Sequence, residues 1–250
     1  MSLLFKRYRY FIIITSLFCE GHAVADEFSL GGMVSLQNSP YKQTNTKVSP
    51  LPIISYDSTY LFFHGLSGGL HLYKDEHNEF NFLAEYSLME FKPGDSDDDS
   101  LKKLNKRKAT MMSGVSFIHH DSWGLIHADF KKDVLGNSQG MTSDVGYDYR
   151  FKWNDLDLSP GVGFLWNSKK QNEYYYGVSS KESSRSGLNI YDPDDSFSPY
   201  IQLALDYPFA ENWKASVMAR YTLLPNEIKN SPMIDKSGSA SFGLGILYTF

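Results

Sequence analysis

Charged side chains that recur inside otherwise apolar segments are the first candidates for chemistry in this sequence. Eight of them occupy the polar phase of alternating segments: Glu85, Asp129, Asp144, Asp148, Arg150, Asp206, Lys214 and Arg220. A charge on the lipid side of a membrane strand costs about 2–4 kcal/mol near the midplane, so we expect all eight to point inward. Because both signs are present, two interpretations stay open: salt bridges across a filled interior, or a narrow, somewhat acidic passage.

The run His119-His120-Asp121 is the cluster most suggestive of a metal site. Neighbouring residues of a strand point to opposite faces, so the two histidines cannot hold one ion without a turn between them. We interpret the run as a solvated turn and predict no metal site.

Three single histidines, His64, His71 and His127, lie in strand-like segments. A Ser–His–acid arrangement is spatial, so residue spacing cannot exclude a hydrolase. The stretch Gly65-Leu66-Ser67-Gly68-Gly69 fits the G-x-S-x-G pattern, but a nucleophile elbow needs a helix directly after it, and the residues that follow alternate as a strand. The sequence therefore predicts no catalytic residue and no cofactor.

Residues 94–108 form a loop with an acidic half, Asp95 to Asp99, and a basic half, Lys102 to Lys108. Carboxylates are ligands for divalent cations, and lysines suit the phosphates of lipopolysaccharide. The spacing is not that of a calcium-binding loop, and a charge run of this kind is most often solvated.

The amino terminus has the pattern of a secretory signal peptide. Lys6, Arg7 and Arg9 precede an apolar run at residues 10–18, and Ala23-Val24-Ala25 provides a cleavage site. The run is about half the ~20 residues that a membrane-spanning helix needs. We therefore predict a signal peptide at residues 1–25 and one mature domain at 26–250.

Removal of this segment has two chemical consequences. Cys19, the single cysteine, leaves with it, so the mature chain has no disulfide and no thiolate. Three basic residues and Glu20 also leave, and the formal net charge changes from −5 to −7. An acidic balance argues against a nucleic-acid partner.

The carboxyl-terminal segment, residues 239–250, alternates with period two and ends on an aromatic residue, as outer-membrane barrel strands typically do. The predicted barrel-assembly signature is its apolar face: Phe242, Leu244, Ile246, Tyr248 and Phe250. A strand with one such face needs either lipid or a protein core beside it.

The same alternation recurs along the mature chain and predicts an all-β fold, a transmembrane antiparallel up-and-down β-barrel of about twelve strands (range 10–14). The expected strands are 28–37, 48–56, 59–66, 69–74, 79–92, 109–118, 123–131, 141–153, 155–166, 197–207, 213–224 and 239–250. An even count requires a tight turn near Ser67-Gly68. Short connections then alternate with long polar ones, which predicts short periplasmic turns and long extracellular loops.

Composition agrees with this fold. Aromatic residues make up 15% of the chain, enough for interfacial girdles, and mean hydropathy is −0.36 because only one face of each strand meets lipid. The alternative is a soluble secreted β-sandwich or a lipocalin-like barrel.

Three stretches resemble the MipA/OmpV family of Gram-negative outer-membrane proteins. They are Ser49-Pro50-Leu51-Pro52 to Tyr56, then Tyr175-Tyr176-Gly177 with Tyr191-Asp192, and finally Arg220-Tyr221 with Asn230 to Ile234 and the closing 243–250. The first loop departs from the family pattern, because it reads Ser39-Pro40-Tyr41-Lys42-Gln43.

The resemblance implies a non-enzymatic barrel in the outer membrane, in contact with lipid and lipopolysaccharide. It implies a scaffold role that links a lytic transglycosylase to a murein synthase. Other relatives suggest an adhesion or stress-response barrel, and the charged interior suggests a narrow porin-like channel for small polar solutes.

Overall fold

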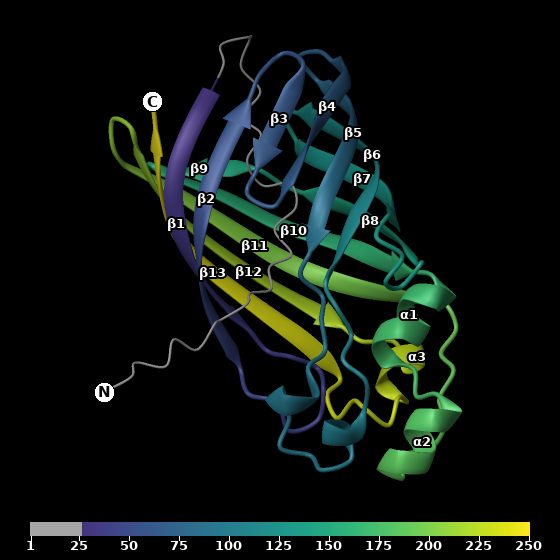
Figure 1. Ribbon diagram of the computed structural model, residues 1–250. Helices are drawn as coiled ribbons and strands as arrows, with labels where there is room; N and C mark the ends of the chain where they lie inside the picture. Colours follow the sequence, from purple (N-terminus) through teal and green to yellow (C-terminus); the bar gives the residue numbers. More distant parts are fainter. Residues whose placement is uncertain (1–26) are drawn as a thin grey trace, which may run out of the picture.

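The alternating segments pair into one antiparallel sheet that closes on itself (Figure 1). The computed structural model describes residues 27–250, so the predicted signal peptide at 1–25 lies outside the described residues. Neighbouring strands in the sheet follow the order β11-β12-β13-β1-β2-β3-β4-β5-β6-β7-β8-β10-β9, and β10 also pairs with β11. Because β8 and β9 both pair with β10, they share one position, and the wall has twelve strands.

The first half of the wall comprises β1 (Glu27–Gln37), β2 (Lys47–Asp57), β3 (Leu61–His64), β4 (Ser67–Lys74), β5 (Asn78–Ser87), β6 (Thr110–Asp121) and β7 (Gly124–Asp133). The second half comprises β8 (Met141–Asp148), β9 (Phe151–Trp153), β10 (Leu156–Asn167), β11 (Ser196–Ala210), β12 (Trp213–Leu223) and β13 (Gly238–Thr249). The helices are α1 (Lys169–Tyr176), α2 (Ser180–Ser186) and α3 (Asn226–Lys229), with 3₁₀ turns at Pro93–Asp95 and Leu101–Lys103.

The predicted fold class, an antiparallel barrel of twelve strands, is confirmed. The barrel closes where β13 pairs with β1, from Ser29 opposite Thr249 to Gln37 opposite Ser241. The short connections and the C-terminus lie at one end, which we call the turn end, and the long connections lie at the other, the loop end (Figure 1).

Three local details differ from the sequence prediction. The strand expected at 79–92 ends at Ser87, where the chain leaves β5 for the cap. The tight turn that preserves parity lies at Gly65–Leu66, two residues before the predicted Ser67-Gly68. The segment 141–153 is not continuous, because β8 ends at Asp148 and β9 begins at Phe151.

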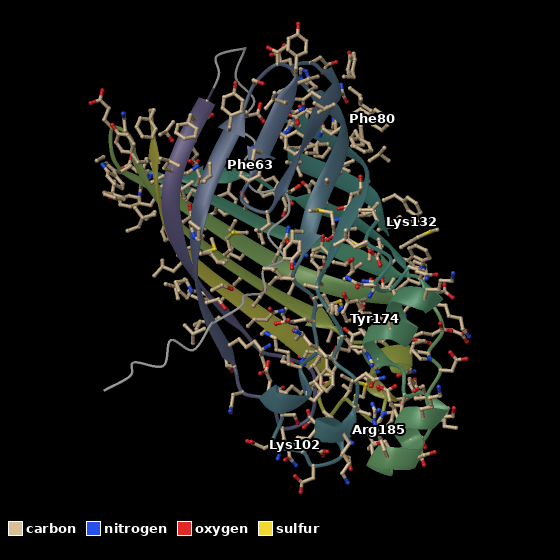
Figure 2. The ribbon with its side chains drawn as sticks, in the orientation of Figure 1. Phe63, Phe80, Lys102, Lys132, Tyr174 and Arg185 are labelled. Atoms are coloured by element: carbon tan, nitrogen blue, oxygen red, sulfur yellow. The ribbon has the colours of Figure 1, made fainter. Side chains whose placement is uncertain are left out.

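Apolar side chains cover the outside of the wall, which fits contact with hydrocarbon. Phe63 and Phe80 project outward near the turn end in Figure 2, and both are exposed. The apolar face of β13 lies on this side, where Phe242, Leu244, Ile246 and Phe250 are exposed. Of this predicted assembly signature, Tyr248 is half-buried and packs edge-on against Phe250, with ring centroids 4.9 Å apart.

None of the helices among residues 27–250 has both the length and the apolar character needed to span a membrane.

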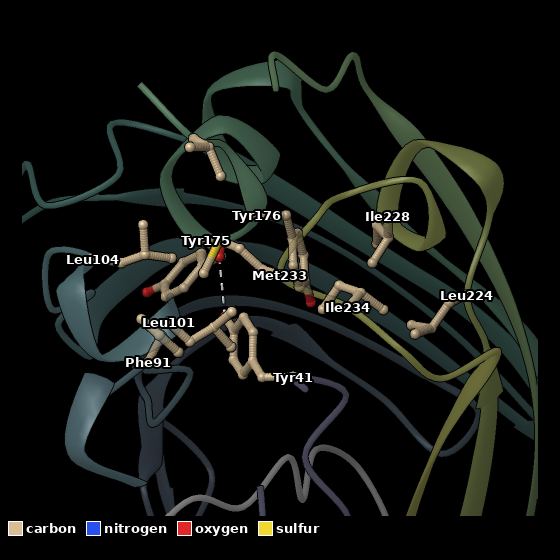
Figure 3. Packing of buried hydrophobic residues seen from close by; sticks show 11 residues of the cluster. Tyr41, Phe91, Leu101, Leu104, Tyr175, Tyr176, Leu224, Ile228, Met233 and Ile234 are labelled. Carbon is tan, nitrogen blue, oxygen red and sulfur yellow. Dashed lines mark hydrogen bonds between the residues drawn. The ribbon is translucent and has the colours of Figure 1, made fainter. Parts of the chain in front are cut away.

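The long connections at the loop end pack into one cap with its own apolar core (Figure 3). Its buried members come from four connections, 38–46, 88–109, 168–195 and 224–237. They are Tyr41, Phe91, Leu101, Leu104, Tyr175, Tyr176, Val178, Leu224, Ile228, Met233 and Ile234. The Tyr41 hydroxyl donates to the Tyr175 carbonyl at 3.1 Å. These connections were predicted as polar loops, and their packing into a core was not.

We expect Gly65→Ala to lower the free energy of unfolding by about 1 kcal/mol, because Gly65 has φ +61° and an L-residue is strained there. No atom lies within 4 Å of an added Cβ, so backbone strain is the whole effect. Urea unfolding from detergent micelles measures it.

The matched control is Gly94→Ala in the cap, where the added Cβ also meets no neighbour. This variant should stay within about 0.5 kcal/mol of the wild type. Equal losses in the two variants would contradict the assignment of strain to the Gly65 turn.

Candidate functional site in the barrel lumen

A stripe of charged side chains runs along the inside of the wall from β5 to β12. On β7, Lys131 lies between two carboxylates, with its Nζ 2.8 Å from Glu85 Oε2 and 3.0 Å from Asp129 Oδ2. All three side chains are nearly buried. Their alternation with lipid-facing residues explains why they share the lumen side.

A second group centres on Asp144 of β8. The Tyr200 hydroxyl donates to Asp144 Oδ1 at 2.6 Å, and His127 Nε2 lies 3.4 Å from the same oxygen. Arg220 Nη1 lies 3.4 Å from Asp144 Oδ2, and its guanidinium stacks on the Tyr200 ring, 4.0 Å from the centroid. Asp144 therefore contacts one guanidinium, one imidazole and one phenol.

Asp148 lies beside this group and is also buried. The Gln202 side-chain amide donates to Asp148 Oδ1 at 2.6 Å, while His127 Nδ1 lies 3.6 Å from Oδ2. Arg220 Nε donates to Gln202 Oε1 at 3.0 Å, which links the two carboxylates through one network. Burying charge is expensive unless it is paired, so this network holds the side chains in fixed positions.

Two glycines make room for the network. A Cβ on Gly146 would lie 2.4 Å from His127 Cε1, and one on Gly163 would lie 2.3 Å from Tyr200 Cζ. Larger residues at either position would displace the ring, so the site depends on the missing side chains as well as on those present.

The three remaining predicted residues lie toward the turn end. Asp206 accepts a hydrogen bond from the Ser216 hydroxyl. Lys214 is half-buried on the inward phase of β12, and Arg150 lies in the break between β8 and β9. The structure thus brings Asp144, Asp148 and Arg220 into one network and joins Glu85 to Asp129 through Lys131. Asp206, Lys214 and Arg150 belong to neither of these two groups and have other contacts.

Sequence reasoning missed three members of the network: His127, Tyr200 and Gln202. His127 was interpreted as a single strand histidine. All three occupy inward positions of their strands. The same period-two alternation that identified the charged residues could therefore have identified them as well.

The partners of His127 limit its chemistry. They are two carboxylates and a phenol, an arrangement that stabilises charge but supplies no serine nucleophile. Within residues 27–250, no group of three or more His, Asp or Glu side chains is arranged to hold a metal ion.

A cavity of about 170 Å³ lies between this network and the cap. Asp144 and Lys131 form part of its floor, and Tyr176, Leu224 and Ile228 of the cap also line it. The lumen therefore contains a chamber with a charged side and an apolar cover.

A buried ion pair links two of the connections that form the cap, 88–109 and 168–195. Arg107 Nη2 lies 2.9 Å from Glu182 Oε1, and both side chains are almost fully buried. Burial by itself raises the pKa of the Glu182 carboxyl, but three interactions outweigh burial and lower that pKa below its usual value. They are the hydrogen bond from the Asn105 N–H, the hydrogen bonds from Ser179, and the charge of Arg107.

Comparison with known proteins gives a consistent picture. The family model described as MltA-interacting protein MipA matches residues 30–250. The MltA-interacting protein of Escherichia coli K12 is 43% identical over 224 residues, covering 90% of each chain. The putative outer membrane protein YiaT of the same strain is 36% identical and covers 91% of this chain and 93% of its own.

More distant relatives and one solved structure agree on the location and the fold. Outer membrane protein OmpV of Vibrio cholerae is 29% identical over 152 residues, covering 61% of this chain and 59% of its own. An outer membrane channel of Pseudomonas putida F1 superposes with a TM-score of 0.50 at 9% identity, covering 96% of this chain and all of that one. The predicted location in the outer membrane is confirmed by these relatives together with the barrel fold.

We expect Asp144→Asn to lower the free energy of unfolding by about 2–4 kcal/mol, because it leaves Arg220 and His127 without their shared carboxylate in a buried site. Chemical unfolding in detergent measures the loss. The control is Asp157→Asn, whose partner Lys152 is well exposed, so that less than about 1 kcal/mol should be lost. A small loss at Asp144 would mean that the lumen network does not hold the wall.

We expect the cap to loosen on acidification. The folded-state pKa of Glu182 is lowered, so its stabilising contribution is present above the unfolded value, about 4.3, and is lost as pH falls through the folded value. Hydrogen-exchange protection factors of residues 101–107 and 180–187 should therefore fall below about pH 4. Glu182→Gln should lower protection at pH 7, and Glu76→Gln at the turn end should leave it unchanged. Protection that is flat with pH would contradict the role of this ion pair.

Proposed function

This chain belongs to the MipA family of outer-membrane β-barrels, and on that premise we propose that it is a non-enzymatic scaffold that associates with a lytic transglycosylase. In an outer-membrane barrel the short turns are periplasmic and the long loops extracellular. The turn end thus faces the compartment that contains murein, and the cap faces outward.

The packed cap is the observation that carries the scaffold proposal. Tyr175 is fully buried at its centre, and the core draws on four separate connections. A solute moving along the barrel axis would have to break this core, whereas a scaffold needs no axial opening. The two relatives named MltA-interacting protein share 43% identity with this chain and supply the class of partner.

The turn end offers the surface that a periplasmic partner would meet. Its connections carry an excess of exposed carboxylates: Asp75, Glu76, Asp121, Asp155 and Glu211. The exposed lysines among these connections and the strand ends beside them are Lys74 and Lys152, and Lys74 is paired with Asp57. Exposed aromatic rings, Tyr60 and Trp153, lie among them. Such a rim favours a partner with a basic surface, because complementary charge steers association.

A narrow channel is the second candidate, and the charged stripe from Glu85 to Arg220 favours it. A barrel of twelve strands lies between fully filled and plainly open cases. In planar bilayers the scaffold proposal expects no discrete steps from the intact protein. Steps that change when Asp148 or Arg220 is neutralised would support the channel instead.

We expect charge reversal at the turn end, Glu76→Lys with Glu211→Lys, to weaken capture of the lytic transglycosylase at least tenfold in a pull-down from envelope extract. The matched control places the same reversal on the cap, Asp97→Lys with Asp99→Lys, and should leave capture unchanged. Failure of the wild-type barrel to recover any murein enzyme would overturn the proposed association.

A further inference from the structure

One hairpin of the wall is too short to reach the cap. β3 has four residues, and it pairs with β2 only from Ser55 to Asp57. β2 continues toward the loop end as far as Lys47 and is paired with β1 over its whole length. On its other side, residues 47–53 have no strand opposite them within the described part of the chain.

This gap, which we call the wall window, has a defined frame (Figure 1). Residues 47–53 of β2 form one side, and residues 87–91, which begin at the last residue of β5, form the other. The turn Gly65–Leu66 forms the lower edge, where the Gly65 N–H donates to the Ile54 carbonyl and the Tyr86 N–H donates to the Leu66 carbonyl. Neighbouring strands of a sheet lie 4.7–4.9 Å apart. Where two strands are missing, three such spacings separate the flanking backbones, which is about 14 Å.

The cap closes the window above. Lys47 Nζ lies 2.8 Å from Asp95 Oδ2 and 3.9 Å from Glu90 Oε1, so an ion-pair cluster spans the gap. A backbone bridge between Thr44 and Ser96 lies beside it. The opening is therefore lateral, and it stays separate from the sealed loop end.

The chamber beneath the cap reaches this opening. Lys47, Ser87, Met89 and Glu90, which flank the window, line the cavity of about 170 Å³. Its other lining residues come from the cap, from β1, from β5 to β8 and from β10 to β13, and none comes from β3 or β4. The chamber thus lies at the height where those two strands are missing.

The surroundings of the window are apolar on the outside. Val48, Pro50 and Pro52 point to the exterior from β2, and Leu66 is exposed at the lower edge. What approaches from this side is therefore dissolved in the hydrocarbon phase. Inside, next to the window edge, Ile53 packs with Met33 and Leu247 in an apolar cluster, so an alkyl chain stays on the outer, lipid-facing side.

The backbone edge of β2 selects the kind of ligand. The Ile54 carbonyl faces β3, and alternate residues share its direction, so the backbone groups of Pro52, Pro50 and Val48 face the window. Proline has no N–H, so this edge presents carbonyl acceptors with few donors. Such an edge is a poor template for an added strand and a good one for a donor-rich head group.

The charged side chains of the chamber are already paired. Lys47 lies beside Asp95 and Glu90, Lys131 lies beside Glu85, and Asp144 lies beside Arg220. The unpaired carbonyl edge of β2 therefore carries the selection, and it suits a protonated amine, which brings N–H donors.

We propose that the wall window admits an amphiphile with a cationic, amine-bearing head group from the lipid phase into the chamber. Two sources share this chemistry: an aminophospholipid of the membrane, such as phosphatidylethanolamine, and a free single-chain alkylamine. The lateral route does not require the barrel to conduct along its axis, so this binding is independent of the scaffold role.

The test is photolabelling of the full mature barrel in phosphatidylcholine vesicles. Three probes carry a diazirine near the head group: phosphatidylethanolamine, a dodecylamine and anionic phosphatidylglycerol. We expect the amine probes to label residues 47–53 and 87–91 at least fivefold more than the anionic probe does. Preference for the two-chain probe identifies the membrane lipid as the source, and preference for the single-chain probe identifies the free amphiphile.

A large side chain introduced at the window should abolish the preferential labelling by the amine probes. Ser87→Trp fills the chamber side of the window, and Leu66→Trp fills its lower edge, so either folded variant suffices. Val34→Trp is the control, since it projects into lipid from β1, which is paired on both sides. Labelling spread evenly around the barrel whatever the head group would overturn the proposal.

Discussion

Hydrocarbon offers no hydrogen-bond partner to a peptide group. A sheet that closes on itself meets this constraint, because its backbone groups pair with those of neighbouring strands. Closure depends on the pairing of the last strand with the first, where nine residues of β1 lie opposite β13. The Phe250 N–H extends this seam by donating to the Phe28 carbonyl at 3.0 Å, and the two rings lie 5.3 Å apart. Once the sheet closes, alternate residues must share one enclosed lumen, and their charges must neutralise one another there.

Period-two alternation was sufficient to predict most of the wall, because only one face of each strand can meet lipid. It failed at Ser67-Gly68, where a turn was predicted but the chain is already inside β4. Gly69 is there because a Cβ would lie 2.1 Å from the Phe82 carbonyl oxygen on the neighbouring strand. A glycine needed for close packing and a glycine needed for a turn look the same in a sequence, and Gly65 with its positive φ is the one that turns.

The sequence predicted which residues face the lumen but not which of them contact one another there. Alternation placed Asp144 and Arg220 on the inward side, yet only the register of four neighbouring strands brings them together. Tyr200 and His127 complete the group without any motif. The cap was the larger omission, since residues 168–195 read as a polar loop. The run Tyr174-Tyr175-Tyr176 was the available signal, because a solvated loop has no use for three adjacent aromatic rings.

The cap also determines how this molecule presents itself to the outside of the cell. Tyr41, Phe91, Tyr176 and Met233 lie far apart along the chain and meet in the cap core. The outward surface is therefore a discontinuous epitope. Antibodies raised against single loop peptides will recognise the denatured chain better than the native barrel, whereas antibodies selected on the intact protein will report that its assembly is complete.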